Sequence, residues 1–125
     1  MKIKLMLGLM AIFLAGPVTA GEALTAEQVK ALFTNKTFDV HNVAKDKNLQ
    51  VHDADGGNHY VYIPWKDKTK QREWWIEGNK HCTSHPKRGN ACKVVLDMGD
   101  GTYKGMTDGE HTHTLSNFRD GNQLP

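Results

Sequence analysis

The sequence predicts a mainly β domain, an antiparallel meander of about seven or eight strands preceded by one short helix. Two observations in the 125-residue chain predict it. From Thr37 onward, short segments rich in β-branched and aromatic residues alternate with Asp-Gly and Gly-Asn turns at intervals of about ten residues. A capping-box pattern, Thr25 to Gln28, precedes this region. We expect the strands to form either a strongly twisted sheet or a small barrel.

The first twenty residues have the pattern of a secretory signal peptide. Lys2 and Lys4 precede an apolar run, and the small residues 18–20 follow Gly16-Pro17 as a cleavage site. As a helix, the run of about 11 residues would span only about 16 Å, which is too short for a membrane anchor. We therefore expect cleavage near Ala20 and a single exported β domain, residues 21–125, that is periplasmic or secreted and has no membrane span.

Cleavage of the leader changes the charge balance. Lys2 and Lys4 leave with it, so 14 basic residues face 14 acidic ones and the mature chain is formally neutral. A nucleic-acid partner needs an excess of Lys and Arg to displace phosphate counterions. The composition therefore excludes nucleic acid and indicates no electrostatic partner.

Cys82 and Cys92 are the only two cysteines of the chain. An even count in an exported domain favours one intrachain disulfide across the short segment that contains Pro86 and Gly89. A redox-active pair would have the Cys-x-x-Cys spacing, which this pair lacks. A metal-thiolate pair is the other alternative.

The helix is expected at residues 26–34. Thr25 and Gln28 would cap it reciprocally, and Val29, Leu32 and Phe33 fall at helical spacing as its apolar face. This face is typical of a helix that covers a core.

Strands are expected in eight segments: 37–43, 48–54, 59–65, 71–77, 80–84, 92–98, 102–107 and 111–118. Alternation places Trp74 and Ile76 on one face and Trp75 on the other, and it separates Val61 and Ile63 from Tyr60 in the same way. If the sheet closes, the result is a small lipocalin-like barrel.

Several short motifs carry a resemblance over most of the mature chain. They are Leu24-Thr-Ala-Glu-Gln-Val-Lys-Ala-Leu-Phe33, Trp74-Trp-Ile-Glu-Gly78, Cys82, Cys92-Lys-Val-Val-Leu-Asp97, Gly101-Thr-Tyr103 and Phe118-Arg-Asp-Gly-Asn122. In their order and spacing the chain resembles a family of small exported proteobacterial proteins known only as a domain of unknown function. The resemblance implies an exported, disulfide-bridged, mostly antiparallel β domain with an N-terminal helix, and no established activity, substrate or cofactor. His81, before the first Cys, and the segment His111-Thr-His113 depart from the pattern.

Histidine is the one compositional excess. The chain holds seven, at positions 41, 52, 59, 81, 85, 111 and 113, roughly three times the average share. His111 and His113, two apart on an expected strand, would point to the same face and share a borderline metal ion. With His81, and with His59 or His52 as a fourth ligand, the set would suit Zn(II), Cu(II) or Ni(II). The alternative is a solvent-facing strand edge in which His alternates with Thr.

Aromatic residues form a second candidate site. Trp75, Tyr60 and Tyr62 lie on the face opposite the expected core, where their rings would stack on a sugar, a peptide or another small ligand. The alternative is core packing.

The chain contains no recognisable catalytic motif. It lacks a Gly-rich phosphate loop and a serine nucleophile elbow, and Asp53-Ala-Asp55-Gly56 fits a hairpin turn better than a calcium loop. We therefore expect a small binding protein, for a metal ion or another small ligand, and not an enzyme. The alternative is a structural or interaction module, such as an inhibitor or adaptor of an envelope protein, that uses the aromatic face.

Overall fold

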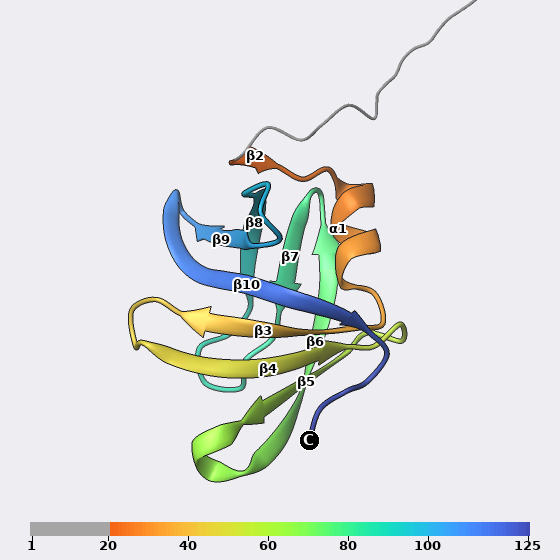
Figure 1. Cartoon of the computed structure of the whole chain (residues 1–125), viewed down its shortest axis with the longest axis vertical. Helices are drawn as coiled ribbons and strands as arrows, with labels where there is room; N and C mark the ends of the chain where they lie inside the picture. Colours follow the sequence, from red (N-terminus) through yellow and green to blue (C-terminus); the bar gives the residue numbers. More distant parts are fainter. Residues whose placement is uncertain (1–20) are drawn as a thin grey trace, which may run out of the picture.

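Eight antiparallel strands form a closed barrel (Figure 1). The computed structural model describes residues 21–125, and the expected signal peptide, residues 1–20, lies outside the described residues. Each strand pairs with the next in sequence, and β10 pairs with β3 to close the sheet. The strands are β3 (Lys36–Asn42), β4 (Lys47–Asp53), β5 (Asn58–Ile63), β6 (Lys68–Glu77), β7 (Lys80–Thr83), β8 (Ala91–Asp97), β9 (Tyr103–Thr107) and β10 (Glu110–Asp120). The expected small barrel with one helix is confirmed.

The N-terminal segment adds two elements that lie against the barrel. Helix α1 (Ala26–Phe33) has the expected capping box: the Thr25 hydroxyl accepts from the Gln28 amide, and the Gln28 side chain accepts from the Thr25 amide. The two-residue strand β2 (Glu22–Ala23), which the sequence pattern did not predict, pairs with β8. In the described chain, no helix is long and apolar enough to cross a membrane.

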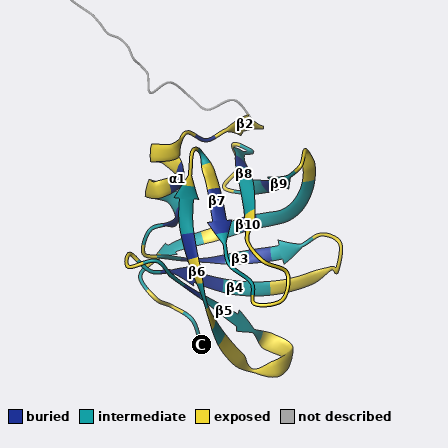
Figure 2. Cartoon of the chain, turned by 180° about the vertical axis from the view of Figure 1, so that it is seen from behind, coloured by how far each residue is buried: buried dark blue, intermediate teal, exposed yellow. Residues whose placement is uncertain are grey.

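Helix α1 contacts β3, β6 and β7 at one end of the barrel (Figure 1). Val29 and Phe33, on the face predicted to be apolar, are fully buried. The Phe33 ring meets Phe38 edge to face at 5.2 Å between centroids, and Phe118 stacks on Phe38 at 4.7 Å. These rings fill this end of the barrel, and Figure 2 shows buried residues within the strands and exposed residues at the turns.

The strands turn at the opposite end through the β3–β4, β5–β6, β7–β8 and β9–β10 connections. The expected strand 59–65 ends at Ile63, because Pro64 has no N–H to continue the ladder and begins a single 3-10 turn, Pro64–Lys66. Asp67 follows in the left-handed region, at φ 48°, and β6 begins at the next residue, Lys68, three residues before the expected strand 71–77. These turns surround the end of the barrel opposite α1, which we call the open end.

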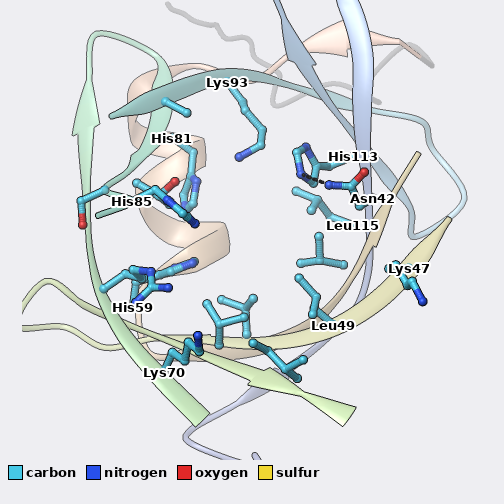
Figure 3. A pocket seen from close by; sticks show the side chains of 18 of the residues that line it. Asn42, Lys47, Leu49, His59, Lys70, His81, His85, Lys93, His113 and Leu115 are labelled. Atoms are coloured by element: carbon cyan, nitrogen blue, oxygen red, sulfur yellow. Dashed lines mark hydrogen bonds between the residues drawn. The ribbon is translucent and has the colours of Figure 1, made fainter. Parts of the chain in front are cut away.

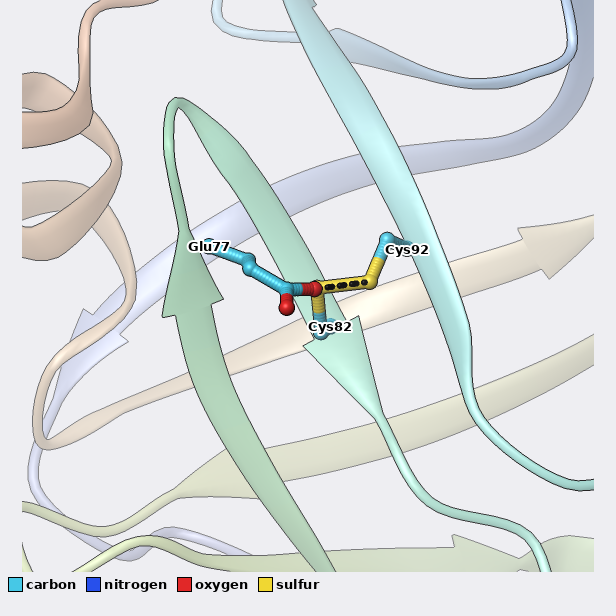
Figure 4. The surroundings of a disulfide bond; sticks show 3 residues. All are labelled: Glu77, Cys82 and Cys92. Carbon is cyan, nitrogen blue, oxygen red and sulfur yellow. Dashed lines mark hydrogen bonds between the residues drawn. A yellow bond between two sulfur atoms is a disulfide. The ribbon is translucent and has the colours of Figure 1, made fainter.

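Cys82 and Cys92 form the expected disulfide. They are direct partners across β7 and β8, and their sulfur atoms lie 2.06 Å apart (Figure 4). Their strand neighbours His81 and Lys93 line the barrel interior, so the alternation of side chains places the bridge on the outer face.

Candidate ligand-binding cavity

The barrel contains a cavity of about 640 Å³ between the end covered by α1 and the open end. Phe33 and Phe38 line its inner end, and Trp65 and Lys66 belong to the turn at the open end. A cavity of this size lies within the range of small-molecule sites, about 300–1,000 Å³.

One side of the cavity is lined by aliphatic side chains. The inward positions of β3, β4, β5 and β10 alternate with outward polar residues and supply aliphatic side chains. They are Val40, Leu49, Val51, Val61, Ile63 and Leu115. This side can accept an apolar body without leaving polar groups unsatisfied.

The lining is strongly basic. Seven of its residues are Lys or Arg: Lys45, Lys47, Lys66, Lys70, Arg72, Arg88 and Lys93. Within the described chain, no Asp or Glu lines the cavity, and none of the ion pairs involves one of these seven. Residues 21–125 hold equal numbers of basic and acidic side chains, but the basic ones are concentrated around the cavity, which composition could not reveal.

Lys93 is the lining cation whose pKa is most clearly affected by burial. It is the direct partner of His81 across β7 and β8, so both side chains share the inner face, and Figure 3 shows both pointing toward the centre of the cavity. Burial lowers the pKa of Lys93, and the charge of Asp53 partly opposes this shift. The ammonium group has no carboxylate within ion-pair distance in the described structure.

His113 faces Lys93 from the other side of β9. Its Nε2 lies 3.5 Å from the side-chain amide nitrogen of Asn42, and its Nδ1 lies 2.9 Å from the Thr112 hydroxyl. Burial lowers the pKa of His113 to about 4, with further contributions from the positive charges of Lys93 and Arg88. The ring is therefore neutral at pH 7 and can accept a hydrogen bond from Asn42.

A buried Asp-His network lies at the inner end of the cavity. Asp53, fully buried at the end of β4, binds His59 Nδ1 through one oxygen at 2.5 Å and His81 Nε2 through the other at 2.7 Å. The His81 ring packs 4.0 Å from Phe33, centroid to centroid. Burial would raise the pKa of Asp53, but the hydrogen bonds of both histidines outweigh it and hold that pKa below its usual value. Burial lowers the pKa of His81.

The four histidines expected to bind a metal are divided between locations. A β-bulge lies between His111 and His113: His111 pairs with Met106, whereas His113 pairs with Gly105. The extra residue reverses the alternation, so the expectation that both point to one face is wrong. His113 lines the cavity, while the His111 ring contacts Thr114 on the outside.

His59 and His81 come together only through Asp53, with ring centroids 6.3 Å apart. In the described chain, the one group of three ligand-type residues with mutually close atoms is Glu77 with Cys82 and Cys92. Both sulfurs there form the disulfide and are not thiolates (Figure 4). A Zn or Cu site made of the expected histidines stays a prediction.

The aromatic residues expected to bind a ligand lie outside the cavity. Trp75 is the direct partner of Cys82 and is thus on the outer face. Tyr60 stacks on His52 at 6.3 Å, and the Tyr62 hydroxyl donates to Asp67 at 2.8 Å. The cavity instead receives the exposed Trp65, whose ring lies 5.0 Å from the Lys47 ammonium at the open end.

Sequence reasoning missed Lys93, Lys70 and the buried role of Asp53. The available signal was alternation: Lys93 stands two residues before the inward Val95, and Lys70 pairs with Val61. A Lys on the apolar face of a strand indicates an interior cation.

Comparison of the chain with family models, with curated proteins and with solved structures finds no match. The resemblance to small exported proteobacterial proteins stays a prediction. The assignment of a function thus depends on the cavity and on its chemistry.

Proposed function

We propose that this protein is an exported binding protein that holds a small organic molecule inside its barrel. The single observation that carries the proposal is the cavity of about 640 Å³, because a side-chain-filled barrel of eight strands has no such space. The leader-like residues 1–20 and the Cys82–Cys92 disulfide support a periplasmic or secreted location.

A binding role also fits the distribution of polar groups. The aliphatic side receives an apolar body, and the few polar groups that converge on the interior, among them Lys93 and Asn42, would fix its orientation. The Asp53 carboxylate is saturated by His59 and His81 and does not line the cavity, so it serves the architecture of the inner end.

The neutral dye N-phenyl-1-naphthylamine provides the test, because its emission increases in an apolar environment. We expect one dye per protein and loss of binding, by about tenfold or more, when Ile63→Trp fills the inward position near the open end. Tyr62→Trp, at the neighbouring outward position, is the matched control and should bind like the unmodified chain. The absence of dye binding, or equal losses in both variants, would overturn the proposal.

A further inference from the structure

The cavity places a hydrocarbon side opposite a basic side. β3, β4, β5 and β10 supply the aliphatic side chains, while β6, β8 and the β7–β8 connection supply Lys70, Arg72, His85, Arg88 and Lys93. Figure 3 shows Lys70 and Lys93 directed inward and Leu49 and Leu115 on the other side. A molecule that satisfies both sides has an apolar body and a negatively charged end.

Lys93 is the cation best placed to meet that charge. Its ammonium lies inside the barrel, where loss of water is costly, and the described residues provide no carboxylate partner for it. Asp53, whose charge acts on Lys93, already binds His59 and His81. A bound anion would form an ion pair with the Lys93 ammonium without displacing an existing one.

The groups beside Lys93 leave room for its stem and add no second positive charge next to its ammonium. His113 is neutral at pH 7, so it does not add a second charge beside the ammonium, and it accepts from Asn42. Gly105 lies between Lys93 and His113, and the lack of a side chain there leaves room for the lysine stem.

The remaining cations lie toward the open end. Lys45 and Lys66 belong to turns at that end, and Arg88 lies in the β7–β8 connection. Their field would attract anions to the entrance and repel cations, which increases association rates most at low ionic strength.

We propose that the ligand is an apolar molecule with an acidic head group, and that the head group binds Lys93 inside the barrel while the hydrocarbon body packs against Leu49, Val61 and Leu115. This assignment rests on the proposed binding function. A carboxylate and a phosphate monoester share the required chemistry.

Four eight-carbon molecules that differ only in the head group test the proposal by displacement of N-phenyl-1-naphthylamine. Octanoate and octyl phosphate are anions, 1-octanol is neutral and octylammonium is a cation. We expect both anions to displace the dye at lower concentration than octanol, and octylammonium to be the weakest. The anion that displaces the dye at the lower concentration identifies the preferred head group.

Lys93→Met keeps the length of the side chain and removes its charge. In this variant we expect half-displacement by the preferred anion to need about tenfold more ligand, with octanol unchanged, because hydrogen bonds to charged groups are the strong ones. Lys104→Met, at an outward position of the adjacent strand β9, should leave both values unchanged. Near-UV circular dichroism verifies that each variant is folded.

The outcomes separate the two proposals. If the dye binds but the anions have no advantage over octanol, or if Lys93→Met weakens octanol and anions equally, the acidic-ligand inference is wrong and the binding function stands. If the dye does not bind the unmodified chain, both proposals are wrong. If Lys93→Met does not fold, Lys93→Gln replaces it, with the same expected loss of anion preference.

Discussion

Lys93 passes so close to Gly105 that a Cβ atom added at the glycine would lie 2.9 Å from the lysine Cδ and 3.5 Å from the Cβ of His113. Gly105 is therefore needed because a larger residue would not fit beside Lys93, and not because of its backbone conformation, which lies outside the left-handed region. It separates the two polar side chains that line this part of the cavity, and any substitution there must move Lys93.

Gly105→Ala should displace the Lys93 stem and abolish the preference of the cavity for anions. We expect unfolding free energy to change by less than about 1 kcal/mol, because the flexible lysine can shift and alanine restricts the unfolded chain. Dye displacement by octanoate and octanol measures the preference. Gly56→Ala, where a Cβ atom meets nothing within 4 Å, is the control. A variant that keeps full anion preference would show that Gly105 does not position Lys93.

Asp53→Asn should be strongly destabilising. It replaces the carboxylate that both His59 and His81 contact in a fully buried site, and loss of a hydrogen bond to a charged group costs about 1.5–3 kcal/mol. Urea denaturation at pH 7 measures the loss. Asp39→Asn, which breaks the more exposed pair with Arg119, should cost less than about 1 kcal/mol. Similar losses in the two variants would contradict the structural role of Asp53.

Stability should decrease as the pH falls from about 6.5 to 4. The pKa of His113 is lowered from 6.5 to about 4 in the fold, mainly by burial and by the charge of Lys93. In this window the unfolded chain binds a proton that the folded chain excludes, so acid favours unfolding. The lowered pKa of His81 acts in the same direction, while Asp53, with a lowered acid pKa, contributes only below its usual value of 3.8.

His113→Asn should flatten this pH dependence by up to one proton in the slope of unfolding free energy against pH. Urea titrations at several pH values between 4 and 7 give the slope. His41→Asn, at a partly buried position on the outer face of β3, is the control and should leave the slope closer to that of the unmodified chain. An unchanged slope in the His113 variant would show that this ring titrates normally in the fold.

Loss of the disulfide should destabilise the barrel by about 3 kcal/mol, as expected from loop closure for a cross-link between residues 10 apart in sequence. The double variant Cys82→Ala/Cys92→Ala removes the bridge without leaving a free thiol. Because Cys82 is fully buried, its truncation adds a packing loss. Comparison with the chemically reduced protein isolates the contribution of the cross-link, and equal stability with and without the bridge would contradict it.

The strands and the helix could be predicted because their signals are local. Thr25 and Gln28 cap α1 as expected, and turn residues such as Asp46, Asp108 and Gly109 adopt the positive φ values that hairpins require. The closure of β10 onto β3 could not be decided from local patterns, since it depends on the summed twist and stagger of all the strands.

The site was less predictable than the fold. Alternation placed His111 and His113 on one face, but the bulge between them reverses it, and one inserted residue in the ladder leaves no clear mark in sequence. The net charge likewise does not indicate which Lys and Arg side chains point into the barrel. Lys93 became a candidate only once β8 was known to turn its Lys93 and Val95 positions inward.

An NMR titration of the amide resonances of the isotope-labelled protein with octanoate tests directly whether an acidic apolar ligand binds inside the barrel. We expect the largest shifts at Lys93, Gly105 and His113, with little change at Tyr60, Tyr62 and Trp75 on the outer face. Shifts confined to those outer aromatic residues, with Lys93 and Gly105 unmoved, would contradict a ligand site inside the barrel.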